Sequence, residues 1–245
     1  MNEVATAPVP SPPKVQRWGL GDALVGWVVV YISASVWGVA VIAATGHAGD
    51  EFDDLPLGVL ALAQLGLAAG FFVVPWLATK LKGNGIVADL GLRVRWSDVW
   101  IGGLAGIATQ IVLLPLLYWP ILEALNKSAD DLEGPAQNLT DRANGPVDVI
   151  LLVLIVGVMA AVFEEIFYRG LVQRSFLKRG MHPVLAVGIT SVLFGATHFQ
   201  LLQLPGLTVA GVVFGTLAYC ADRLGPAIAA HLTFNMVTVI ALLAA

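Results

Sequence analysis

The stretch that decides the fold is Phe163-Glu164-Glu165-Ile166-Phe167-Tyr168-Arg169. It places two carboxylates and a guanidinium inside a long apolar run. A charged side chain in the middle of a membrane helix costs at least ~2.5 to 3.5 kcal/mol. Three such residues within six positions therefore indicate a site rather than a lipid-facing surface.

Helical geometry separates the two glutamates. Glu165 and Arg169 are four residues apart and lie ~40° from each other around a helix axis, so they can form an ion pair that supports the structure. Glu164 is turned ~100° away from Glu165 and has no partner in its own helix. An unpaired buried acid must find donors elsewhere, become protonated or take part in chemistry.

The composition around this stretch is that of an integral membrane protein. Of the 245 residues, 58% are hydrophobic and only 12% are charged, against ~25% charged in soluble domains. The single cysteine, Cys220, provides neither a disulfide nor a thiolate cluster within one chain. The net charge of -4 argues against nucleic acid as a partner.

The apolar runs predict an all-α transmembrane bundle of about seven spans, with six to eight as the range. Each run approaches the ~20 residues that a helix needs to cross the hydrocarbon. They cover residues 23–44, 55–79, 99–122, 149–163 continuing into the motif, 183–204, 207–221 and 225–245. Residues 1–20 are rich in proline and are predicted to be a disordered cytoplasmic tail. Residues 21–245 then form one transmembrane domain.

The connecting segments predict the orientation, because cytoplasmic loops collect Lys and Arg. With the N-terminus inside, the outer segments hold only Lys127 and Arg142. The inner segments hold ten basic residues, namely Lys14, Arg17, Lys80, Lys82, Arg93, Arg95, Arg174, Lys178, Arg179 and Arg223. The ten-to-two split favours a cytoplasmic N-terminus and an outer C-terminus.

Two later apolar runs also carry polar residues. Phe194 and His198 lie one turn apart in the fifth predicted span, and His231 and Asn235 have the same spacing in the seventh, where both could address one point. Glu164 and His198 are each 17 residues from Met181, so antiparallel helices would hold them at equal height. His231 lies only six residues after Gly225. Either the last helix starts deep in the protein, or these depths are wrong.

Three pairs of glycines at i and i+4 lie within predicted spans: Gly66 with Gly70, Gly102 with Gly106, and Gly211 with Gly215. Such pairs let helix backbones approach closely, and we interpret them as packing sites within the chain. No internal repeat is evident, which disfavours an inverted-repeat transporter.

In sequence order, Glu-Glu-x-x-x-Arg, Phe-x-x-x-His and His-x-x-x-Asn resemble the motifs of the CPBP family of intramembrane proteases. This family is named for the type II CAAX prenyl endopeptidases and bacteriocin-processing enzymes, and is also called Abi. The resemblance covers residues 147–240. It implies a protease in a bacterial cell membrane that cuts a membrane-associated protein or peptide, such as a prenylated or leader-type substrate.

The resemblance also implies the residue roles. Glu164 would be the catalytic carboxylate, and His198 its partner in activating water. His231 and Asn235 would stabilise the oxyanion, while Glu165, Arg169 and Phe194 would support the site. A Zn²⁺ ion bound by Glu164, His198 and His231 is an open alternative to a metal-free glutamate mechanism, which we favour slightly because the sequence has no His-Glu-x-x-His motif.

Two non-protease hypotheses stay open. One is a membrane immunity or scaffold protein of the same fold that uses these residues to bind a partner. The other is a transporter that uses Glu164 as a proton relay, a role suggested by any acid within a membrane span.

Overall fold

The computed structural model describes residues 15–244, and these contain helices and no strands. The first half of the chain forms α1 (Leu20–Ala44), the short η1 (Phe52–Asp54), α2 (Leu57–Lys82), α3 (Ile86–Leu90), α4 (Trp96–Ala108), η2 (Thr109–Leu113), α5 (Leu114–Leu125) and α6 (Ala129–Thr140). The second half forms α7 (Pro146–Leu152), η3 (Val153–Met159), α8 (Ala160–Glu165), η4 (Ile166–Gln173), α9 (Arg174–Lys178), α10 (Pro183–Ala196), α11 (Leu204–Ala221) and α12 (Gly225–Leu243).

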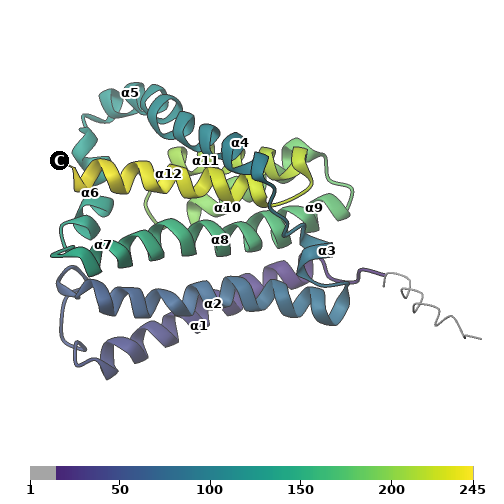
Figure 1. Cartoon of the computed structure of the whole chain (residues 1–245), viewed down its shortest axis with the longest axis horizontal. Coiled ribbons are helices and arrows are strands. Elements are labelled where there is room, and N and C mark those ends of the chain that lie inside the picture. Colours follow the sequence, from purple (N-terminus) through teal and green to yellow (C-terminus); the bar gives the residue numbers. More distant parts are fainter. Residues whose placement is uncertain (1–14, 245) are drawn as a thin grey trace, which may run out of the picture.

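Within residues 15–244, six continuous helices are long and apolar enough to cross a membrane, which confirms the all-helical bundle and indicates an integral membrane protein. They are Leu20–Ala44, Leu57–Lys82, Trp96–Leu125, Pro146–Lys178, Leu204–Ala221 and Gly225–Leu243. Their outer faces are apolar where a soluble protein would be polar. On α1, for example, Val25, Ile32 and Val39 are all at least 60% exposed. Figure 1 shows these helices side by side along one direction.

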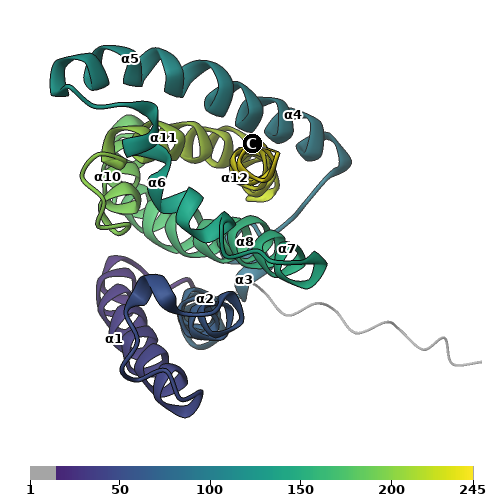
Figure 2. The same cartoon turned by 90° about the vertical axis from the view of Figure 1, so that its left-hand side faces the viewer.

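The fifth predicted span, residues 183–204, differs from the prediction. Its helix, α10, has 14 residues and ends at Ala196, so it measures about 21 Å against a hydrocarbon core of roughly 30 Å. Three residues beyond the helix, Phe199 takes a left-handed backbone conformation with φ 55°. The chain returns through residues 197–203 into α11, so α10 and α11 form a hairpin within the bundle (Figure 2).

Most of the predicted disordered tail, residues 1–14, lies outside the described residues. Residues 15–20 of the predicted tail are described, and two of their side chains bond to Asp89. The Trp18 side chain is 2% exposed and donates a hydrogen bond to Asp89 over 3.0 Å. Gln16 donates to the same carboxylate over 2.9 Å. Asp89 therefore ties the start of α1 to the segment around α3.

All three predicted glycine pairs lie where helices approach closely. Gly66 and Gly70 face Trp37 and Val30 of α1. A Cβ at Gly102 or Gly106 would collide with the backbone carbonyls of Pro226 and Ala230 in α12. Gly211 and Gly215 in α11 face α10 and η4 and offer their carbonyl oxygens to side chains of η4. These glycines act in packing within the chain.

The last residues of the turn between α11 and α12 are buried, which answers the question of His231's depth. Leu224 is fully buried, and its N–H donates to the Gly91 carbonyl over 2.9 Å. The Gly225 N–H donates to the Arg93 carbonyl over 3.1 Å. Hydrogen bonds to the Asp98 carboxylate raise the pKa of Arg223 beside this turn. Because α12 begins beneath residues 91–95, His231 reaches the level of Glu164 within two turns.

Candidate active site

The carboxylates lie on one long helix that departs twice from regular α geometry. The α8 segment, which carries Glu164 and Glu165, is flanked by the π-helical segments η3 and η4. Such wide turns are rare and occur frequently at functional sites. Each holds a glycine against a neighbouring element: Gly157 faces Met236 of α12, and Gly170 faces Leu90 of α3.

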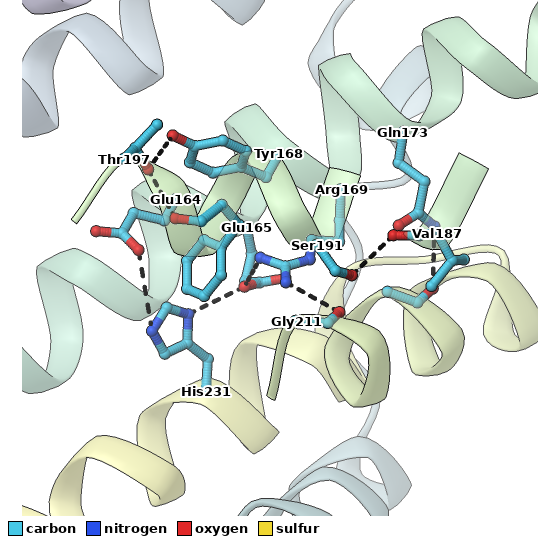
Figure 3. A network of polar contacts seen from close by, with 12 residues as sticks. Glu164, Glu165, Tyr168, Arg169, Gln173, Val187, Ser191, Thr197, Gly211 and His231 are labelled. Atoms are coloured by element: carbon cyan, nitrogen blue, oxygen red, sulfur yellow. Dashed lines mark hydrogen bonds and ion pairs between the residues drawn. The ribbon is translucent and has the colours of Figure 1, made fainter. Parts of the chain in front are cut away.

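The predicted ion pair between Glu165 and Arg169 is confirmed. Arg169 Nη1 donates to Glu165 Oε1 over 2.7 Å, and both side chains are fully buried. Arg169 Nη2 donates to the Gly211 carbonyl over 3.1 Å (Figure 3). The guanidinium lies 4.5 Å from the centre of the Phe194 ring. The guanidinium thus joins the helix of the motif to α10 and α11 and offsets the charge of Glu165.

His231 reaches both glutamates. Its Nδ1 lies 3.0 Å from Glu165 Oε1, and its Nε2 lies 4.0 Å from Glu164 Oε2 (Figure 3). Since a carboxylate oxygen only accepts hydrogen bonds, Nδ1 carries the hydrogen that bonds to Glu165. The imidazole stacks on Phe214 at 4.9 Å and meets the edge of Phe194 at 5.6 Å. Nε2 is the ring nitrogen turned towards Glu164.

The predicted position of His198 within a helix is wrong, because the residue lies beyond the end of α10. Its Nδ1 donates to the Phe194 carbonyl over 2.9 Å, and its ring packs on the Phe194 ring at 5.1 Å. A carbonyl oxygen only accepts, so a neutral His198 keeps its lone pair on Nε2. The structure describes both His198 and Glu164 and records no ion pair between them; Phe194 contacts both histidine rings.

Asn235 and His231 have different hydrogen-bond partners in the structure. Asn235 Nδ2 donates to the Val156 carbonyl in η3 over 2.7 Å. Val156 precedes Glu164 by eight residues, or about 12 Å along a helix. Val156 lies within the π-helical segment η3. Asn235 therefore joins α12 to the helix that carries the glutamates.

Replacing Asn235 with alanine is expected to lower stability, because the Val156 carbonyl loses its donor. The loss should be about 0.5 to 1.5 kcal/mol for one hydrogen bond, or roughly 2 to 4 °C per kcal/mol in a chain of this size. Thermal unfolding of the purified protein in detergent measures it. Thr238→Ala, one turn further along α12, is the control, and an unchanged melting temperature in Asn235→Ala would contradict a structural role for this bond.

The proposed metal ligands do not assemble into a metal site. Among residues 15–244, no three His, Cys, Asp or Glu side chains gather closely enough to hold an ion. His231 directs one ring nitrogen to each glutamate, and the structure records no ion pair between His198 and Glu164. These residues do not fit a Zn²⁺ ion bound by Glu164, His198 and His231, so we derive no step through a metal.

The sequence of this region matches one family model. Residues 146–237 match the model described as type II CAAX prenyl endopeptidase Rce1-like. These residues form an Rce1-like domain. The domain begins at α7 and ends within α12, so it contains every residue of the three motifs. No curated protein and no solved structure matches the chain.

Outside the Rce1-like domain, α2 contributes a residue that the sequence analysis missed. A pocket of about 10 Å³ lies between α2 and α8 and is lined by Gln64 and Glu164 among apolar side chains. That volume suffices for about one water molecule. Glu164 Oε2 is buried without a hydrogen-bond partner, and the structure records no side-chain hydrogen bond for Gln64 among the described residues. A glutamine within an apolar span is the signal that could have identified it.

A second contribution from outside the Rce1-like domain comes from Tyr31 of α1. Its hydroxyl lies 3.2 Å from the Tyr168 hydroxyl, which lies 2.9 Å from Thr197 Oγ1. Thr197 in turn donates to the Phe194 carbonyl over 2.7 Å. Thr197 directly precedes His198, so this chain of hydroxyls attaches the His198 loop to α1. No motif in the sequence connects these three residues.

Proposed function

We propose that the protein is an intramembrane endopeptidase that hydrolyses a peptide bond of a membrane-associated protein or peptide. The observation that carries the proposal is the buried Glu164 carboxylate, which lines a water-sized pocket, has one oxygen without a hydrogen-bond partner and lies beside His231. Amide hydrolysis requires a base next to a water molecule. Membership of residues 146–237 in the Rce1-like family supports the same reaction class.

In the proposed mechanism, Glu164 accepts a proton from water in the pocket while the water oxygen attacks the scissile carbonyl carbon. Nε2 of His198 is the free acceptor that helps to orient this water. The tetrahedral oxyanion receives hydrogen bonds from His231 through a protonated Nε2 and from the second amide hydrogen of Asn235, since the first is donated to Val156. The proton then passes from Glu164 to the leaving amine, and the C–N bond breaks.

Gln64 is proposed to hold the attacking water from the α2 side. Its side-chain carbonyl can accept the second hydrogen of a water that donates the first to Glu164, which directs the oxygen lone pair at the substrate. Glu165, Arg169 and Phe194 keep His231 in place through the contacts described above.

Replacing Gln64 with leucine is expected to lower kcat on the order of 100-fold and to leave KM nearly unchanged, because a misplaced reactant costs about that much. Leucine is similar in size and is favourable in an apolar helix, so folding is preserved. Gln110→Leu is the matched control, since Gln110 is also a glutamine of an apolar helix but does not line the pocket. Equal kinetics of the two variants would remove Gln64 from the mechanism.

The experiment that tests the function compares peptide ends in membranes of cells that contain the wild type or Glu164→Gln at equal abundance. Mass spectrometry of protein termini provides the readout. Termini that are present with the wild type and missing with the variant establish a protease and identify its substrate. Identical termini together with an intact cellular phenotype would assign the protein to the binding or scaffold class.

A further inference from the structure

A pocket of about 360 Å³ lies at the end of the bundle where α1 begins and α9 ends. Figure 1 shows this end opposite the C-terminus. Its walls are the start of α1 on one side and α9 with the following residue on the other. The charged and aromatic residues that line it are Arg17, Trp18, Asp22, Lys178 and Arg179. The pocket is separate from the glutamates of the candidate active site.

The charge of the pocket is positive. Its one carboxylate, Asp22, is already used by an ion pair with Lys82 and by the Gly19 N–H, 3.0 Å away. Lys178 is held at the wall, because its ammonium donates to the Trp18 carbonyl over 2.6 Å and lies 3.6 Å from the Trp18 ring centre. Within residues 15–244, the structure records no ion pair for the side chains of Arg17 and Arg179. Two guanidinium groups are thus available to a ligand.

The surface next to the pocket is apolar. One turn further along α1, Leu24, Val25 and Val28 are 57%, 66% and 48% exposed. A free phosphate ion would use only the cations, whereas a phospholipid would use both the cations and this apolar face. Basic pockets between helices on the cytoplasmic side of membrane proteins bind anionic headgroups, and the distribution of Lys and Arg predicts that this end is cytoplasmic.

We propose that this pocket binds the phosphate of an anionic phospholipid from the inner leaflet, with the acyl chains along the exposed face of α1. Arg17 and Arg179 contact the phosphate. The lipid would join α1 to α9, and so connect the N-terminal helix to the helix of the motif. This inference is independent of the proposed proteolysis.

The full chain is placed in phosphatidylcholine nanodiscs that contain increasing amounts of phosphatidylglycerol. Native mass spectrometry of the protein released from them then measures how much phosphatidylglycerol stays bound. Arg17→Gln/Arg179→Gln is expected to weaken retention of phosphatidylglycerol by about 10- to 30-fold, since each cation near an anionic surface contributes on the order of 1 kcal/mol. Lys80→Gln/Arg93→Gln is the matched control. It removes two exposed cations of the cytoplasmic segments that do not line the pocket.

The site is supported if the control variant retains phosphatidylglycerol as the wild type does and the pocket variant loses it. Equal loss in both variants would show a diffuse effect of surface charge and overturn the proposal. Wild-type retention in the pocket variant would also overturn it. If inorganic phosphate at millimolar concentration displaces phosphatidylglycerol completely, the ligand is a free phosphate and the lipid assignment is wrong.

Discussion

Glu164→Gln is expected to reduce the rate of peptide cleavage by about 100- to 10,000-fold, the contribution that general acid–base catalysis makes. Glutamine has the size of glutamate but cannot accept the proton of the attacking water. Oε2 of Glu164 accepts no hydrogen bond, and the one ion pair recorded for this carboxylate is the 4.0 Å contact with His231. Removing its charge should therefore change the stability of the protein little. The measurement is the initial rate of cleavage of the substrate identified from its termini.

The control for this variant is Glu133→Gln, which removes one carboxylate from α6, far along the chain from the motif. It should cleave at the wild-type rate. The abundance and melting temperature of Glu164→Gln should also equal those of the wild type. Undiminished cleavage by Glu164→Gln would refute the assignment of Glu164 as the base and, with it, the proposed mechanism.

Arg169→Met is expected to destabilise the protein by about 3 to 5 kcal/mol, because it leaves the fully buried Glu165 carboxylate without its counter-charge. It also removes the donor to the Gly211 carbonyl and the cation beside the Phe194 ring. Because Glu165 is fully buried, no water can solvate its charge in place of the lost guanidinium. Thermal unfolding in detergent and the yield of folded protein after size exclusion measure the effect.

The double variant Glu165→Gln/Arg169→Met separates the charge effect from the packing effect. Removing both charges should recover part of the lost stability, since replacing a whole buried pair costs less than breaking it. If Arg169→Met alone unfolds at the wild-type temperature, the ion pair does not support the fold. If the double variant is as unstable as the single one, the contacts to Gly211 and Phe194 are the larger part of the effect.

The features that could be predicted from sequence are those set by local chemistry. The apolar runs predict the long helices because hydrophobic length alone decides whether a helix can span the bilayer. The pairing of Glu165 with Arg169 follows from a spacing of four residues. The glycine pairs predict close helix contacts, although their partners in α1 and α12 are not visible in the sequence. The cytoplasmic position of the N-terminus stays a prediction.

The features that could not be predicted depend on contacts between distant parts of the chain. His198 has the spacing of a helical residue, yet α10 ends before it, and a chain of hydroxyls from α1 holds the resulting loop. Asn235 lies one helical turn from His231, yet its side chain bonds to the Val156 carbonyl in the π-helical segment η3. Gln64 was missed because only the packing of α2 on α8 brings it to Glu164.

The packing of α12 has a consequence for the evolution of this protein. The last helix contacts α4 through Gly102 and Gly106, and Thr233 donates to the Gly103 carbonyl over 3.2 Å. Its first residues are covered by residues 91–95. All these partners precede residue 146, where the family resemblance begins. The segment that matches the family model is thus shorter than the unit that packs together, and residues 146–237 alone would lack the surface on which the start of α12 and His231 are held. Residues 91–106 can diverge in sequence only as far as they preserve that surface.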